Sequence, residues 1–387
     1  MNESARFKMK LGVIGAPPHW KGPDGALWAF EPYVREMRVW ADLFSDVEIC
    51  AHAGEGEMKG NLAPYERENI TIRQVRYTTD HGFSGARRRL FQLPGLTWQA
   101  RRTLRDTDFT LLRAPSHFAL VGLVLVWLMG KRSITKWAGG NASFRGERIP
   151  TRVNRWLEAL TTKDHFTLVY GEARRPHHIS FIPALMTAGE LAAGRRAAGA
   201  RLWNPPWKIL CVGRLELVKN FDLVLRGLGE LSRRRPDLPW TFTLVGGGRE
   251  AENLRVLAGE CAIADRVTFT GPLQFGEVQK RYGASHVVIM PGIQEGWPKV
   301  IAESWAHGAI PLGARAGIVP WILADPKAGA VFDPTPAGLA ETLARVLSAP
   351  STMSSMSEHL YAHAEDLSLD QFRVRLEKVL TERYGLS

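Results

Sequence analysis

Two glutamates, Glu295 and Glu303, stand eight residues apart in a segment with the features of a phosphate and sugar site. Glu295 lies in a glycine-containing loop after a short apolar strand, and Pro298 suits the first position of the following helix. Backbone N–H groups in the first turn of such a helix form an anion site. Glu303 falls about one and a half turns into the helix, where its carboxylate is expected to bind sugar hydroxyls. The alternative is two solvent-facing glutamates favoured by the helix dipole.

Two cations, Arg214 and Lys219, follow another apolar strand and precede a helix. The guanidinium offers a two-pronged donor and the ammonium a point charge, so the pair is a candidate for binding a diphosphate. Two unrelated surface cations are the alternative.

The three glycines at 246–248 follow the next strand, where glycine lets backbone approach a ligand closely. The alternative is that these glycines only form a tight turn. The sequence contains neither the dinucleotide fingerprint G-x-G-x-x-G nor the phosphate loop G-x-x-x-x-G-K-[ST].

These candidates need elements that bring them together, and the chain supplies short apolar strands alternating with amphipathic helices. That alternation predicts parallel α/β sheets. In the first half we expect helices over 34–44 and 116–130, and strands over 11–15, 47–52, 70–77, 109–113, 133–136 and 167–170. After a linker-like stretch at 204–207 we expect helices over 221–231, 249–259 and 298–307, and strands over 208–213, 241–245, 267–270, 287–290 and 310–313. Gly308 is expected to form a left-handed cap on the helix before it.

The composition is that of a folded protein with an anionic partner. Among 387 residues, 45% are hydrophobic and 23% charged, which excludes a disordered chain or a small disulfide scaffold. The net charge is +11, and residues 1–200 hold 29 basic and 19 acidic side chains, so almost all of the excess lies in the first half. A membrane surface, a phosphorylated substrate or nucleic acid would suit that half.

Four motifs in a fixed order resemble the retaining glycosyltransferases of family 4, group 1 glycosyl transferases with the two-domain GT-B fold. They are GRLxxxKN at 213–220, VGGG at 245–248, RVTFTG at 266–271 and the two glutamates of the E-x₇-E signature. The resemblance covers roughly the C-terminal half of the chain, judged by domain size. It implies an α/β fold of two Rossmann-like doubly wound domains that face an interdomain cleft. The first loop, residues 22–25, departs from the family's usual pair of adjacent glycines.

The resemblance implies a nucleotide-diphosphate sugar of the UDP or GDP type, held mostly by the C-terminal domain. Arg214 and Lys219 would neutralise the diphosphate, Glu303 would bind ribose hydroxyls, and Glu295 would contact the donor sugar. Fixed cations stabilise the charge that grows on the leaving diphosphate, so no cofactor and no metal are implied. The other positions implied for the donor are Gly25, Gly246, Gly247, Gly248, Thr270, Leu273, Gly296, Trp297, Lys299 and Val300.

The first half departs from the family where many relatives carry a histidine at the end of the fourth strand. This chain has Arg113 there, and His117 follows at the start of the next helix. His117 is a candidate for orienting the acceptor or donor sugar, and a solvent-facing histidine is the alternative. Lys136, Asn141 and Arg145 are further candidates near a later strand end.

Three other features have simpler interpretations. Residues 106–108 spell D-x-D, a metal motif in another glycosyltransferase fold, but they precede a strand and are predicted to be a loop. The twelve-residue apolar run at 118–129 is shorter than the roughly twenty residues that span a bilayer, so we expect a buried helix. The three cysteines stand in no metal-ligand spacing and are expected to be buried thiols.

Residues 87–102 mix five arginines with leucine, phenylalanine and tryptophan. This mixture suits binding to an anionic membrane surface or a charged acceptor. One alternative is that the side chains stack on nucleic acid, and another is that the segment is a solvated loop and helix without a partner. We favour the membrane or a lipid-linked acceptor and expect no nucleic acid, because the sugar-transfer motifs explain the rest of the chain. With no apparent signal peptide, we expect a cytoplasmic protein that is peripheral to the membrane.

The resemblance therefore implies an acceptor-binding domain over 1–204, a nucleotide-sugar domain over 205–366 and, as in the family, a helix over 367–387 that returns to the first domain. The activity that the resemblance implies is retaining transfer of a sugar to a glycan or lipid-linked acceptor, and we expect it to serve the assembly of a bacterial surface polysaccharide. A nucleotide-sugar epimerase or phosphorylase of the same fold is one alternative. A non-catalytic basic module that binds nucleic acid or membrane is another, but it gives the charged pairs no reason to occur together.

Overall fold

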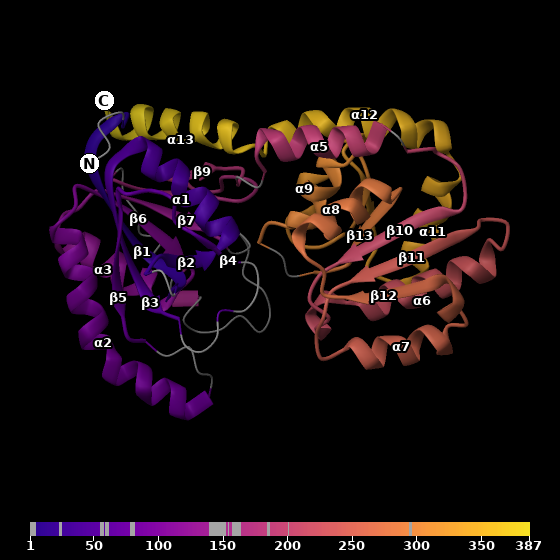
Figure 1. Cartoon of the computed structure of the whole chain (residues 1–387), viewed down its shortest axis with the longest axis horizontal. Helices are drawn as coiled ribbons and strands as arrows, with labels where there is room; N and C mark the ends of the chain where they lie inside the picture. The colour runs from indigo at the N-terminus through magenta and orange to yellow at the C-terminus, as the bar shows by residue number, and fades with distance from the viewer. Residues whose placement is uncertain are drawn as a thin grey trace. The chain divides into compact units, whose positions relative to one another are not determined.

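The computed structural model describes residues 5–22, 25–54, 58, 62–77, 82–138, 152–153, 155–156, 164–183, 186–199, 201–293 and 296–387. It divides into two compact units (Figure 1). The N-terminal unit comprises residues 1–181 with 372–387, and the C-terminal unit comprises residues 182–371. Each unit is built on one sheet flanked by helices, so the expected fold class, two Rossmann-like α/β units, is confirmed.

The N-terminal sheet is parallel, except where β1 and β4 each pair with β2, and β1 lies near its middle. Its parallel strands follow the order β5-β3-β1-β6-β7-β8-β9, a doubly wound arrangement. A short antiparallel extension, β2 with β4, joins the end of β1. The strands are β1 (Phe7–Lys21), β2 (Leu27–Phe30), β3 (Phe44–Ala53), β4 (Leu62–Pro64), β5 (Ile70–Val75), β6 (Phe109–Ala114), β7 (Ser133–Trp137), β8 (His165–Val169) and β9 (His178–Ser180).

Helices cover both faces of this sheet, because alternate side chains of each buried strand point to opposite faces. Helices α2 (Gly82–Arg105) and α3 (His117–Leu128) pack on the face that carries Ile14, Cys50 and Leu112. On the other face, Phe44 stacks on Trp40 of α1 (Glu31–Leu43), and Phe109 meets Tyr384 of α13 (Leu369–Tyr384) edge to face. The last helix is therefore part of the N-terminal core.

The C-terminal sheet is wholly parallel and follows the order β12-β11-β10-β13-β14-β15. Its strands are β10 (Trp207–Val212), β11 (Trp240–Val245), β12 (Val267–Gly271), β13 (Val287–Met290), β14 (Ile310–Ala314) and β15 (Ala330–Phe332). The helices of this unit are α5 (Ala188–Gly199), α6 (Phe221–Arg234), α7 (Ala251–Glu260), α8 (Phe275–Ala284), α9 (Lys299–Ala306), α10 (Val319–Ile322), α11 (Pro336–Leu347) and α12 (Pro350–Glu365). Two short 3₁₀ turns, Leu217–Lys219 and Ala264–Arg266, follow β10 and α7. Gly308 has φ of 58°, which confirms the expected cap after α9.

The two boundaries between units differ from those expected at 204 and 366. They fall after residues 181 and 371, because α5 packs against α8, α9 and α12 of the C-terminal unit. Arg201, just after α5, donates to the backbone oxygens of Gly308 and His307, both at 2.7 Å. The linker-like prolines at 205–206 therefore lie inside the C-terminal unit.

The apolar run at 118–129 forms α3, which is buried on only one side. Phe118, Leu123 and Val126 pack in the core, whereas the Leu128 side chain is 79% exposed. Among the described residues, every helix is too short or too polar to cross a membrane. Cys50 and Cys211 are buried free thiols and Cys261 is half-buried, so the expected burial holds fully for two of the three.

Candidate active site

Four neighbouring strands of the C-terminal sheet end in loops that carry the sequence motifs. The loops are held together by hydrogen bonds between backbones. Gly213 N–H donates to Val245 O at 3.0 Å, Leu215 N–H to Gly247 O at 2.9 Å, and Gly246 N–H to Gly271 O at 3.0 Å. Because β13 is the direct neighbour of β10, the GRLxxxKN, VGGG, RVTFTG and Glu303 segments all adjoin one carboxyl edge.

The glycines of the VGGG motif allow two loops to pack backbone against backbone. A Cβ atom on Gly246 would lie 1.8 Å from Gly213 O, and one on Gly248 would lie 2.2 Å from Leu215 O. Gly246 also has φ of 142°, a conformation that side-chain-bearing residues rarely adopt. We expected these glycines to let backbone approach a ligand. The observed reason for two of them is contact with the protein's own chain, and Gly247 is less crowded.

The two predicted diphosphate cations lie on the loop between β10 and α6. The Arg214 side chain is exposed, and Lys219 is half-buried at the end of the 3₁₀ turn Leu217–Lys219. Asn220 ends this turn in the left-handed region with φ of 54°, which asparagine tolerates better than most residues. Its Nδ2 donates to Pro291 O at 3.4 Å, after β13. Asn220 thus ties the loop of Lys219 to the loop that leads to α9.

Helix α9 begins one residue later than expected. Pro298 is the N-cap residue, and Lys299 is the first helical residue. Glu295 lies outside the described residues. Gly296, Trp297, Lys299 and Val300 are each half-buried at the start of the helix. Val300 and Trp297 also pack on the core, so part of each side chain has a structural role.

Glu303 is half-buried on α9 and accepts a hydrogen bond from Tyr282 Oη on α8, at 2.6 Å to Oε2. Burial raises the pKa of the Glu303 carboxyl, while the Tyr282 hydrogen bond and the nearby Lys299 ammonium oppose this increase. Tyr282 is itself fully buried and stacks on His307, with ring centroids 5.6 Å apart. The hydroxyl therefore holds one carboxylate oxygen of Glu303 in place.

The positions expected near the base lie after β11 and around the end of β12. The Thr270 hydroxyl donates to Gly271 O at 2.8 Å, so it is engaged with backbone in this structure. Leu273 is half-buried and packs against a small core that includes Leu210, Val245 and Tyr282. Both residues lie at the same sheet edge as the other motifs, on the side of β12.

Two candidates from the N-terminal half form a buried ion-pair cluster instead of an open site. Arg113 Nη1 donates to Glu36 Oε1 at 2.7 Å, and Lys136 Nζ donates to Glu36 Oε2. Lys136 is only 3% exposed. Burial opposes ionisation of Glu36, but the two cations outweigh it and lower the pKa of this carboxyl to about 2. Lys136, a candidate near a strand end, therefore has its charge neutralised by Glu36 inside the unit.

His117 lies where expected, as the first residue of α3. Its ring lies 6.1 Å from the ring of Tyr77, and partial burial with the nearby Arg89 lowers its pKa. Gly25 has φ of 79° in the turn before β2, which gives a structural reason for glycine there. Asn141 and Arg145 lie outside the described residues.

The D-x-D segment is a loop and strand start, as expected. Asp106 pairs with Arg73 and Arg105, at 3.3 and 2.9 Å. Asp108 Oδ2 accepts from Lys10 N–H at 2.8 Å. Both carboxylates therefore have protein partners that explain their presence.

Sequence reasoning missed Glu36, Tyr282 and Asn220, which hold candidate side chains or their loops in place. Asn220 could have been found, because it ends the GRLxxxKN motif in which Lys219 was singled out. Glu36 carried a weaker signal, as a charge among the apolar positions of the helix predicted at 34–44. Nothing in the local sequence around Tyr282 indicates a partner for Glu303.

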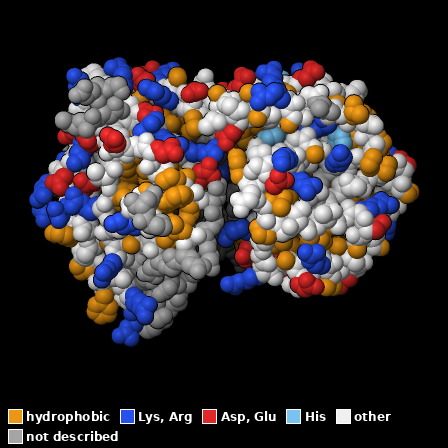
Figure 2. All heavy atoms as spheres, in the orientation of Figure 1, with side chains coloured by type: hydrophobic (Ala, Val, Ile, Leu, Met, Phe, Trp, Pro, Cys, Tyr) orange, Lys and Arg blue, Asp and Glu red, His pale blue; other side chains and the backbone are white. Residues whose placement is uncertain are grey.

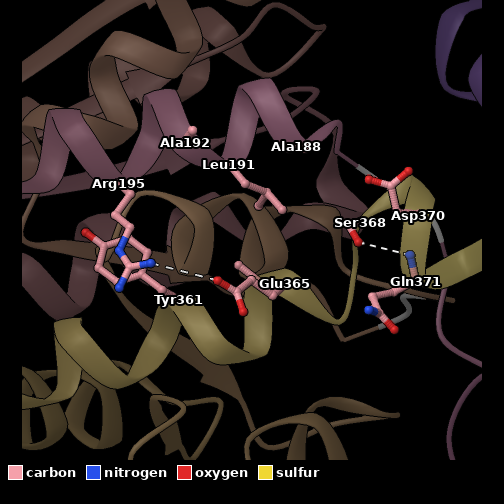
Figure 3. A pocket seen from close by; sticks show the side chains of 10 residues that line it. Ala188, Leu191, Ala192, Arg195, Tyr361, Glu365, Ser368, Asp370 and Gln371 are labelled. Carbon is pink, nitrogen blue, oxygen red and sulfur yellow. Dashed lines mark hydrogen bonds and ion pairs between the residues drawn. The ribbon is translucent and has the colours of Figure 1, made fainter.

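A separate pocket of about 380 Å³ lies between α5 and α12 (Figure 3). Arg195 faces Glu365 across it, with 3.8 Å between Nη1 and Oε1, and its guanidinium stacks on the Tyr361 ring. Ser368 Oγ accepts from Gln371 N–H at its other end. None of the residues that line the pocket is among the predicted site residues.

Comparison with known proteins places these motifs in a family. Residues 200–363 match the family described as glycosyl transferases group 1. D-inositol 3-phosphate glycosyltransferase 2 from Catenulispora acidiphila is 30% identical over 395 residues, covering 92% of this chain and 90% of that protein. The corresponding enzyme from Acidothermus cellulolyticus is 31% identical over 224 residues, covering 54% of this chain and 48% of that protein.

The chain spans about half the length of several other curated relatives that it matches. The crystal structure of Anabaena HepE in complex with UDP has a similar fold, with a TM-score of 0.70 and 14% identity. That alignment covers 97% of this chain and 99% of HepE. Together with the four motifs at one sheet edge, the relative aligned over nearly its whole length assigns the family: this chain belongs to the group 1 glycosyl transferases.

Proposed function

We propose that this protein is a retaining glycosyltransferase of family 4. It moves a sugar from a nucleotide-diphosphate donor of the UDP or GDP type to a glycan or lipid-linked acceptor. The observation that supports this most is the position of Arg214, Lys219 and Glu303 on loops and a helix at one carboxyl edge of the C-terminal sheet. Ligands of doubly wound sheets bind at that edge. HepE, which shares the fold, was crystallised with UDP.

Each proposed role follows from the chemistry of the side chain. When the bond from sugar to phosphate breaks, negative charge grows on the leaving diphosphate. Arg214 and Lys219 would stabilise that charge, so the reaction needs no resident metal. Glu303 would accept hydrogen bonds from the ribose hydroxyls, with Tyr282 holding its carboxylate in position. Glu295 would contact the donor sugar, and His117 would orient the acceptor or the sugar.

The acceptor is proposed to belong to the assembly of a bacterial surface polysaccharide. Relatives are named for other acceptors, such as D-inositol 3-phosphate and a phosphatidylinositol mannoside. The last of these is a lipid-linked glycan, which fits the class of acceptor proposed here.

Nucleotide binding gives the direct test of the donor class. UDP, GDP and their sugar conjugates should raise the melting temperature of the purified protein, with one nucleotide series giving the larger shift. At 100 times its dissociation constant, a ligand adds about 2.7 kcal/mol of stability. Glu303→Ala should abolish the shift, and Glu252→Ala, an exposed glutamate on α7, should retain it. Equal shifts in both variants would exclude Glu303 from the donor site.

We propose that α2 also brings the enzyme to an anionic membrane. Its solvent-facing side carries Phe91 and Trp98, 78% and 55% exposed, at helical spacing with Arg87, Arg101 and Arg105. Arg102 lies over the Trp98 ring at 4.8 Å. Figure 2 shows hydrophobic and basic side chains beside one another over the lower end of α2. A helix line that presents two exposed aromatic rings with arginines before and after them can place the rings at a membrane interface and the cations at anionic headgroups.

Vesicle flotation tests this contact. The protein should float with vesicles containing phosphatidylglycerol and stay unbound with pure phosphatidylcholine, because the arginines require anionic lipid. The double variant Phe91→Ser with Trp98→Ser should lose most of the floating fraction. Val256→Ser, a change of an exposed residue on α7, serves as the control for loss of surface hydrophobicity. Flotation that is unchanged in the double variant would place the contact elsewhere.

A further inference from the structure

Three side chains of the C-terminal unit, Asp325, His359 and His363, converge outside the predicted donor site. The two histidines lie four residues apart on α12, so they share one face of the helix. Asp325 lies in the segment between α10 and β15. Its Oδ2 is 3.0 Å from His359 Nε2 and 3.3 Å from His363 Nε2. The three ligand atoms all lie within 4.8 Å of one another.

The donor set and its spacing match a metal site. Imidazole nitrogen and carboxylate oxygen are both ligands of Zn²⁺, and two histidines at i and i+4 on a helix are a recurring chelating pair. Ligand bonds of about 2.0–2.2 Å in a tetrahedron place the ligand atoms about 3.3 Å apart. The two separations from Asp325 Oδ2 are close to that value.

The surrounding contacts hold the three groups in place. Asp325 Oδ1 accepts from Lys327 N–H at 2.8 Å, which leaves Oδ2 aimed at the histidines. The His363 ring packs on Trp305 with centroids 5.1 Å apart, and its buried Nε2 lies 3.3 Å from Asp325 Oδ2 without making a hydrogen bond. A buried imidazole nitrogen without a hydrogen bond would gain from binding a ligand.

We propose that Asp325, His359 and His363 bind one Zn²⁺ ion, with water as its fourth ligand. The ion would link the segment after α10 to α12. Because α12 packs against α9 and β14, the ion would brace the helix that carries Glu303 without contacting the proposed donor site. Its role is therefore structural, and it does not depend on the proposed function. The side chains are partly exposed, with 26–39% of their surface open to solvent, so an ion can enter.

The test is a zinc titration of the full chain after treatment with EDTA, read by competition with a chromophoric chelator. One equivalent should bind, and zinc should raise the melting temperature. His359→Gln and Asp325→Asn should each weaken zinc binding by more than about tenfold. In known metal sites, even mutating a residue that only hydrogen-bonds to a ligand lowers metal affinity by that factor. His177→Gln, a change of a histidine in the other unit, is the matched control and should bind zinc like the wild type.

Cobalt provides a second measurement on the wild-type protein that does not depend on any variant folding. Co²⁺ in place of zinc should give the intense visible absorption of a four-coordinate ion, and zinc should displace it. Absence of a bound equivalent would overturn the proposal, as would equal affinity in His359→Gln and His177→Gln. In either case the three residues would form only an ion-paired cluster of Asp325 with the histidines.

Discussion

Lys219→Ala is expected to lower kcat/KM for sugar transfer by about 10²–10³-fold, the loss seen when one preorganised charge-stabilising group is removed from an active site. The reason is that Lys219 lies on the loop after β10, where Asn220 fixes the turn against Pro291. A point charge held there stabilises the diphosphate most when its bond to the sugar breaks. The loss should therefore appear mainly in kcat, measured by release of nucleoside diphosphate.

Lys208→Ala is the matched control for this prediction. Lys208 is exposed near the start of β10, at the opposite end of this strand from the loop that carries Lys219. Its replacement by alanine removes one positive charge, as Lys219→Ala does. Turnover should stay near the wild-type value in that variant. If Lys219→Ala and Lys208→Ala were equally active, Lys219 would be only a surface cation.

Glu36→Ala is expected to destabilise the N-terminal unit by about 3–5 kcal/mol, the cost of breaking a buried ion pair by removing one partner. Glu36 is the only carboxylate described as bonded to both Arg113 and Lys136. Without it, two buried cations lose their counter-charge. Urea unfolding followed by circular dichroism measures the change. Glu31→Ala on the same helix removes a half-buried i,i+4 pair with a single arginine, Arg35, and should cost less, about 1 kcal/mol.

The same cluster predicts how stability falls in acid. The pKa of Glu36 is lowered from 4.5 to about 2 in the folded protein. A lowered carboxyl pKa stabilises the fold above the unfolded value and loses this effect as pH falls toward the folded value. Stability should therefore decrease between about pH 4.5 and 2, and the slope should be smaller in Glu36→Gln. Identical slopes would show that Glu36 carries no net stabilisation.

The regular elements of the C-terminal unit follow closely from local sequence. The strand over 287–290 and the helix that begins at Phe221 start where expected. Buried parallel strands are short apolar runs, and an amphipathic helix shows its core face as a 3.6-residue period. Helix α2 was harder to predict, because its arginines and the internal Pro94 obscure that period. The antiparallel pair of β2 with β4 was missed, since one of the strands has only three residues.

The candidate site likewise has features that local sequence predicts and features that only the tertiary structure decides. The sequence alone predicted that Arg214, Lys219 and Glu303 follow strands of one parallel sheet, because motif order and strand periodicity are local properties. Only the tertiary structure decided which groups are neutralised by partners distant in the chain. Lys136 reaches a carboxylate 100 residues away, and Glu303 accepts from Tyr282, 21 residues away.

The glycines of VGGG show the same contrast for the backbone. The sequence predicted that they follow a strand, but it did not predict their contact with the loop after β10. Hydrophobic periodicity records which face of an element is buried, and it carries no record of which side chain or backbone lies opposite. That information exists only once the strands have been ordered in the sheet, which is why the sequence determined the elements and the motifs while the fold determined their partners.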